Sequence, residues 1–276
     1  MPAVQAVWVS SDGNWNTPGS WSTAAVPLDT DEVVFDGSSQ VNVSNGLDQT
    51  TIYLTSLVRL PGYRGRIGTS GGPLRIAAHD VVLLGNGETY IKGESTGADV
   101  INNLVLDGQR GYAQIDGDVI RVYVKRGEML VAEGTDDITL MALTSVQSVA
   151  TINYAAGNTI ATLIVERGTC LNRREVTTRM VIGDGIVTQS GHGTIAELSQ
   201  YGGRFTYTPD FYPLANPAIT NLNLFGGWSD FSSAHGIIYV TNMIRGPNAT
   251  VTEGSFGIAK NSYWQDLTLT IPLAGP

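Results

Sequence analysis

Cysteine is almost missing from this sequence, since Cys170 is the only one in 276 residues. A single cysteine excludes an intrachain disulfide and a cysteine-rich metal site. Only 15% of residues are charged and the formal net charge is −9, so no basic patch can release many counterions on nucleic acid. No run of about 18 apolar residues occurs, and no charged start with an apolar core marks a signal peptide. We therefore expect no nucleic-acid or membrane partner and a protein made in the cytoplasm.

A short apolar phrase repeats along the chain. Its clearest copy is Ile160-x-x-Leu163-x-Val165-x-x-Gly168. Successive copies begin about 20 residues apart, which is the period of a solenoid coil. The other copies begin at Leu54, His79, Ile101, Val119, Ile138, Thr177, Ile195, Ile219 and Ile238.

The phrase predicts a β-solenoid. Pairs such as Leu163-x-Val165 point alternate side chains to one face, and the glycine that follows supplies a corner. One such unit cannot bury its apolar face alone, so units must stack. We expect an all-β, right-handed parallel β-helix of about ten coils, with the hand given by the rule for parallel crossovers. A β-sandwich or jelly roll is the alternative, although its strands recur at about 8–12 residues.

Both ends of the chain differ from the repeat. Residues 1–50 are rich in tryptophan and predict an aromatic cap on the open end of a β-helix over 51–250. Residues 251–276 predict a C-terminal strand that caps its own chain or pairs with another. Residues 209–217, rich in proline, predict a protruding loop. We expect partner contacts at these aromatic and apolar positions: Trp8, Trp15, Trp21, Phe35, Phe211, Tyr212, Tyr263, Trp264, Leu267, Leu269 and Ile271.

The N-terminal motif carries a resemblance to a known group. It reads Gly13-Asn14-Trp15-Asn16-Thr17-x-x-Ser20-Trp21-Ser22, and Pro27, Asp29, Asp31, Val33 and Phe35 follow. Over roughly residues 8–70 this order resembles the opening of tailed-bacteriophage and prophage proteins that continue into glycine-rich β-helical coils. The resemblance implies a virion component and supplies no catalytic residues. Related openings occur in secreted β-helices such as autotransporter passenger domains, which is the second interpretation.

Catalytic and metal-binding patterns are weak. Gly191-His192-Gly193 matches one element of the polygalacturonase family, but the only adjacent carboxylates, Asp136-Asp137, lie nearly three coils away, roughly 14 Å. Glycosidase carboxylates must lie about 5–10 Å apart. His79 and His235 are isolated. We therefore predict no enzyme activity, no cofactor and no metal. Several acidic residues fall at expected corners, where we interpret them first as turn residues and only second as calcium ligands: Asp107, Asp116, Asp118 and Asp184.

These observations favour a structural virion protein of a tailed phage. Within that class we expect a head decoration or cement protein on the surface of the phage head. Its partners would be the major capsid protein and two further copies of itself in a homotrimer. The alternatives are a tail fibre or tailspike that binds host-surface glycan, with depolymerase activity as an option, and a secreted adhesin-like β-helix.

Overall fold

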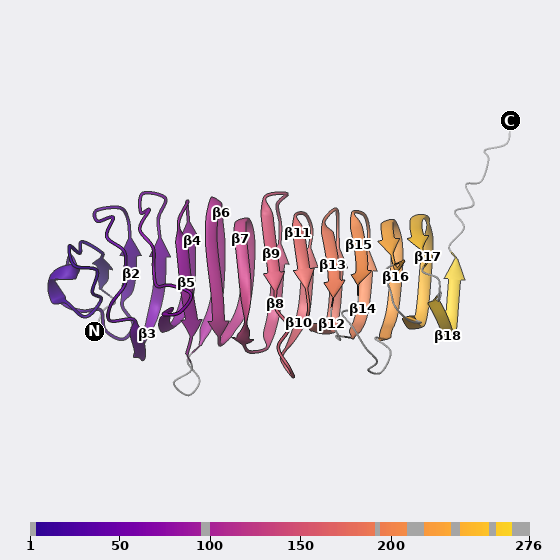
Figure 1. Cartoon of the computed structure of the whole chain (residues 1–276), viewed down its shortest axis with the longest axis horizontal. Helices are drawn as coiled ribbons and strands as arrows, with labels where there is room; N and C mark the ends of the chain where they lie inside the picture. The colour runs from indigo at the N-terminus through magenta and orange to yellow at the C-terminus, as the bar shows by residue number, and fades with distance from the viewer. Residues whose placement is uncertain are drawn as a thin grey trace.

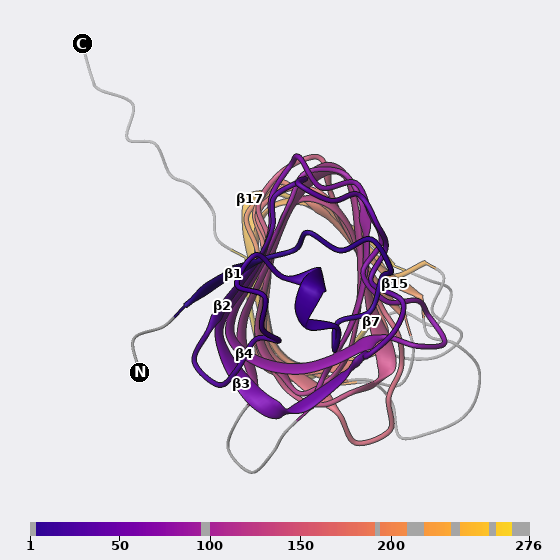
Figure 2. The same cartoon turned by 90° about the vertical axis from the view of Figure 1, so that its left-hand side faces the viewer.

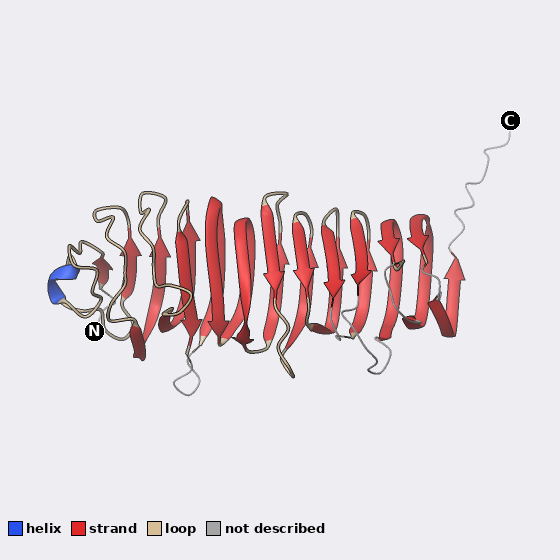
Figure 3. Cartoon of the chain, viewed as in Figure 1, coloured by secondary structure: helices blue, strands red, loops and turns tan. Residues whose placement is uncertain are grey.

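The chain is all-β, as predicted. The computed structural model describes residues 4–94, 100–190, 194–208, 218–232, 238–253 and 258–266. Within these ranges the elements are strands and one short 3-10 helix, η1 (Figure 3). Their bounds are β1 Gln5–Val7, η1 Pro18–Ser20, β2 Glu32–Phe35, β3 Asp48–Arg59, β4 Leu74–Leu84, β5 Glu88–Gly93, β6 Ile101–Gly117, β7 Val119–Thr135, β8 Ile138–Leu143, β9 Ser148–Ile152, β10 Thr159–Val165, β11 Thr169–Asn172, β12 Glu175–Ile182, β13 Ile186–Ser190, β14 Ile195–Gln200, β15 Arg204–Thr208, β16 Ala218–Asp230, β17 Ile238–Thr252 and β18 Ile258–Asp266.

The strands stack in parallel along one long axis (Figure 1). Val34 of β2 pairs with Val58 of β3, and Val58 pairs with Val82 of β4. The same parallel register joins each later coil to the next, from β6 and β7 to β17 and β18. The result is a β-solenoid of about 9 turns, close to the coil number expected from the repeat. A β-sandwich is excluded, because its strands pair antiparallel.

The repeated phrase supplies the inward-facing side chains. Seen along the axis, the walls of the solenoid enclose one continuous interior (Figure 2). A row of register partners runs along it, and each side chain in this row is 0% exposed. Because side chains alternate along a strand, the residues between them face outward. The inward row consists of Leu57, Val81, Leu104, Val122, Met141, Leu163, Met180, Leu198 and Leu222.

The glycine that ends the phrase makes a corner that other residues cannot. Gly168 has φ 91°, in the left-handed region. A Cβ atom there would lie 2.4 Å from the carbonyl oxygen of Ser148, one coil earlier. Both the conformation and the close stacking of coils therefore require glycine.

Rows of buried polar side chains interrupt the apolar interior. Asn172 and Gln189 are register partners, both 0% exposed, and the Asn172 amide donates to Gln189 Oε1 at 2.7 Å. The Gln189 amide donates in turn to the carbonyl oxygen of Arg174 at 3.1 Å. The Asn172 and Gln189 amides thus each donate to a neighbouring coil, which offsets the cost of burying them.

Arg174 joins three coils through backbone carbonyls. The residue is 1% exposed, and its guanidinium donates to the carbonyl oxygens of Ala132, Thr135, Asp136 and Asn153 at 2.8 to 3.1 Å. Burial lowers the pKa of Arg174, although a guanidinium is so strong a base that it keeps its charge. The side chain therefore acts as an internal clamp.

We predict that Arg174→Ala lowers the free energy of unfolding by about 3 kcal/mol, because four carbonyl acceptors lose a charged donor. Arg174→Lys should recover only part of this, since a compact ammonium cannot reach four separated carbonyls. Urea unfolding followed by circular dichroism measures both values. Arg179→Ala, an exposed arginine of β12, is the control and should change stability by less than about 0.5 kcal/mol. Equal stability of the Arg174→Ala and control variants would refute the clamp.

Candidate functional site

Three tryptophans close the N-terminal end of the solenoid. The Trp15 and Trp21 ring centroids lie 4.7 Å apart at 71°, and those of Trp8 and Trp21 lie 5.0 Å apart at 68°. Phe35 lies against all three rings. The indole N–H of Trp8 donates to the carbonyl oxygen of Val41, which satisfies it inside the cluster. These edge-to-face contacts form the predicted aromatic cap, and the segment lies across the mouth of the ring in Figure 2.

These four aromatic residues, which the sequence also offers as partner contacts, are buried within the chain. Trp8, Trp15 and Phe35 are 0% exposed and Trp21 is 2% exposed, so the chain itself covers their rings. Aromatic rings bury the most apolar area per residue, which makes them common both at interfaces and over the open end of a core. Here all four aromatic rings belong to the core. Partner contact at these four residues stays a prediction.

A hydroxyl-rich loop holds the cap in place through Asp12. Its Oδ1 accepts the backbone N–H of Asn14 at 3.0 Å and the hydroxyls of Ser10 and Ser20 at 2.9 and 3.1 Å. Its Oδ2 accepts the hydroxyl of Thr17 at 2.9 Å. These hydrogen bonds, led by that from Asn14, favour the ionised form and lower the pKa of Asp12 to about 2.

The other predicted contact residues lie toward the C-terminal end. Tyr263 and Trp264 belong to β18, where they pair in parallel with Asn242 and Met243 of β17. The predicted contacts Phe211, Tyr212, Leu267, Leu269 and Ile271 lie outside the described residues. For all seven residues, partner contact stays a prediction.

An apolar stripe runs along the outer face of one wall. It is one residue out of phase with the inward row, so its side chains face outward. The stripe crosses nine successive strands in register, from β1 to β12, a length of roughly 38 Å at strand spacing. Seven of its nine side chains are half-buried, and the other two, Val34 and Ala142, are 8% and 7% exposed. The stripe consists of Val7, Val34, Val58, Val82, Val105, Tyr123, Ala142, Ile164 and Val181.

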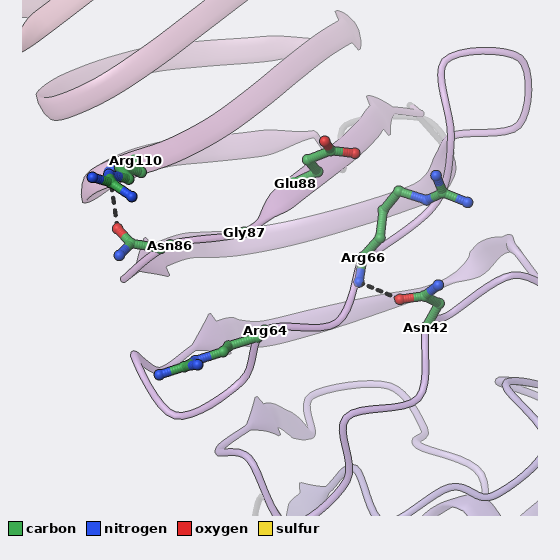
Figure 4. A pocket seen from close by; sticks show the side chains of 7 residues that line it. All are labelled: Asn42, Arg64, Arg66, Asn86, Gly87, Glu88 and Arg110. Carbon is green, nitrogen blue, oxygen red and sulfur yellow. Dashed lines mark hydrogen bonds between the residues drawn. The ribbon is translucent and has the colours of Figure 1, made fainter.

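A second feature, the basic hollow, lies at a corner of four successive coils (Figure 4). Its volume is about 400 Å³. Among the described residues, no carboxylate lies within ion-pair distance of its three guanidiniums, on Arg64, Arg66 and Arg110. Its complete lining is Asn42, Arg64, Arg66, Asn86, Gly87, Glu88 and Arg110.

Amide side chains fix the backbone that carries these arginines. Asn42 Oδ1 accepts the backbone N–H of Arg66 at 2.7 Å, and Asn86 Oδ1 accepts that of Arg110 at 2.9 Å. Gln40 Oε1 accepts the backbone N–H of Arg64 at 2.8 Å. In each pair the amide precedes the arginine by 24 residues. This spacing is the sequence signal for the amide–arginine pairs, and the apolar repeat makes it hard to notice.

Arg59 lies directly beneath the basic hollow. It is 0% exposed and takes an inward position between Phe35 and Leu83, in a row that is otherwise largely apolar. It donates to Thr89 Oγ1, and a Cβ atom at Gly87 would lie 3.2 Å from its Nη1. Burial lowers the pKa of Arg59 to about 10, so the side chain is a cation at neutral pH.

Two of the acidic corner residues, Asp107 and Asp116, and the neighbouring pair member Asp137 have structural partners. Asp107 pairs with Arg126, Asp116 accepts the N–H of Gly117, and Asp137 accepts the backbone N–H of Thr159. Throughout the part of the chain that the structure describes, no three histidine, cysteine, aspartate or glutamate side chains gather closely enough to hold a metal ion. His192 and His235 lie outside the described residues.

Comparison with known proteins adds no relative. No protein-family model, curated protein or solved structure matches this chain. No described helix is both long and apolar enough to cross a membrane.

We predict that the cap loop makes stability depend on pH at low pH. The pKa of Asp12 is depressed in the folded state, so its stabilising effect is present above its unfolded pKa, about 4, and is lost as pH falls through about 2. Asp12→Asn should unfold at a lower temperature than the wild type at pH 7. This difference should shrink between pH 4 and pH 2.

Thermal unfolding at pH 7, 4, 3 and 2 measures the effect. Asp184→Asn, at an exposed corner outside the cap, is the matched control and should unfold with the wild type at pH 7. A difference between Asp12→Asn and the wild type that stays constant down to pH 2 would contradict the proposed role of the carboxylate.

Proposed function

We propose that this chain is a structural protein of a tailed-phage virion, where it decorates the head and stabilises the assembled capsid. It acts by burying surface and makes or breaks no covalent bond. A protein that binds only the assembled lattice stabilises that lattice by mass action. The resemblance of residues 8–70 to phage and prophage proteins supports the virion assignment. The apolar stripe is the structural observation that supports stabilisation by buried surface.

The stripe supports association between copies of this chain. Extended apolar patches on a soluble surface mark interaction sites. The stripe presents one apolar residue per strand at a rise of roughly 4.8 Å, over nine strands from Val7 to Val181. A partner must have the same rise to match it along its whole length. A second copy of this chain has that rise.

The decoration role favours three parallel copies around a shared axis. Closed symmetry places equivalent residues at the same height and leaves no stripe uncovered. Parallel copies present the same end to the capsid, whereas antiparallel copies would present opposite ends. The cap seals the N-terminal end, so the C-terminal end with β18 is the one proposed to contact the major capsid protein.

The place of the protein in the particle tests the function directly. Purified virions of the phage that encodes it would be labelled with gold-conjugated antibody and viewed by electron microscopy. Gold over the whole head surface is the expected result. Gold on tail fibres would overturn the decoration role in favour of receptor binding, and unlabelled particles would overturn the virion assignment.

We predict that a charge in the stripe dissociates the trimer. Val105→Asp and Ile164→Asp each place a carboxylate in the proposed interface, where burial without a partner is costly. Sedimentation equilibrium should show monomers, and binding to capsids that lack the protein should weaken at least tenfold. Thr169→Asp, exposed on β11 outside the stripe, is the matched control and should remain trimeric. Trimers of Val105→Asp with unchanged capsid binding would contradict the proposal.

A further inference from the structure

The basic hollow is a positively charged site on a protein whose net charge is negative. The chain carries a net charge of −9, yet Arg64, Arg66 and Arg110 all line one corner, with Glu88 as the single carboxylate of the lining. The buried cation of Arg59 adds to the positive potential from below. Positive charge that is focused in a hollow attracts anions even when the whole molecule repels them.

The arrangement of the arginines favours a ligand with several anionic groups. Guanidinium groups bind carboxylate, sulfate or phosphate oxygens through paired hydrogen bonds. Arg64 and Arg110 lie two coils apart, with Asn86 on the coil between them (Figure 4). Two strand spacings separate their backbones by roughly 10 Å, and the guanidiniums of Arg64 and Arg66 point to opposite sides in Figure 4, so the three arginines do not meet at one oxyanion. A polymeric ligand with repeated anionic groups can place one group on each arginine.

The remaining groups favour a saccharide. Glu88 is an acceptor for hydroxyl donors, which sugars carry at most ring positions and a DNA backbone does not carry. Tyr112 is the register partner of Glu88 on the next coil, and its ring lies 5.7 Å from that of Tyr90. These half-exposed rings offer apolar faces beside the hollow, against which a sugar ring can pack.

We propose that the basic hollow binds an acidic oligosaccharide. Its carboxylate or sulfate groups lie on Arg64, Arg66 and Arg110, and its hydroxyls donate to Glu88. The amide ladder of Gln40, Asn42 and Asn86 holds the arginine backbones in place before the ligand arrives. This inference goes beyond the proposed function, because the hollow lies outside the apolar stripe and is complete within one chain.

Isothermal titration calorimetry on the full chain tests the ligand class. The probes are an oligogalacturonate hexamer, a heparin-derived hexasaccharide, neutral maltohexaose, inorganic phosphate and a single-stranded DNA 12-mer. We expect binding of one or both acidic hexasaccharides, weakening as salt rises, with maltohexaose and phosphate at least tenfold weaker. Tighter binding of DNA, equal binding of maltohexaose or of phosphate alone, or no binding of either acidic hexasaccharide would overturn the proposal.

Variants locate the binding. Arg64→Gln and Arg110→Gln should each weaken acidic hexasaccharide binding about tenfold, the effect of losing one charge-assisted interaction. Arg121→Gln removes an exposed arginine of β7 outside the hollow and is the matched control, with unchanged affinity. Circular dichroism verifies that the variants fold. Equal affinity of all three variants would place the ligand elsewhere and overturn the assignment.

Discussion

The stacking of each coil on the next, in parallel and in register, is the constraint on which the molecule depends. It couples backbone hydrogen bonding to burial, because the register that pairs Leu104 with Val122, and Val122 with Met141, also places all three side chains inside. A slip of one residue would turn the inward row outward and expose it. The stripe on the outer face inherits the same register, which is why its residues recur once per coil.

A stacked fold creates a difficulty at its ends, where a coil has no neighbour. The N-terminal end is closed by Trp8, Trp15 and Trp21 inside a loop held by Asp12. Such closure prevents edge-to-edge association at this end. The closed end leaves two kinds of surface for binding: the C-terminal end, and the walls on which the apolar stripe and the basic hollow lie.

Much of the fold follows from the sequence, because the interior repeats. The phrase Ile160-x-x-Leu163-x-Val165 identifies the inward row and the solenoid, and the tryptophans identify the cap. The candidate surfaces were harder to predict. Aromatic residues serve cores and interfaces equally, so composition alone cannot show that Trp8 is buried. Arg59 and Arg174 are charged, and only three-dimensional packing shows that they lie inside with oxygen partners from other coils.

The basic hollow could be found from the sequence only with the coil length in hand. Its three amide–arginine pairs are each separated by 24 residues, but the coils vary in length, so this spacing does not stand out. The apolar stripe is also difficult to recognise in the sequence. Its valines alternate with the inward row, and in a linear sequence the two together look like one apolar strand.

Cross-linking with a short bismaleimide tests most directly whether copies meet along the stripe in parallel register. Val58→Cys and Ile164→Cys would be compared singly, with Thr169→Cys as the control. Cys170 does not compete, because burial raises the pKa of its thiol to about 12. The account predicts that each stripe variant cross-links to its own counterpart in another copy and that the control does not. Cross-links confined to the control, or formed only when Val58→Cys is mixed with Ala142→Cys as in antiparallel pairing, would contradict it.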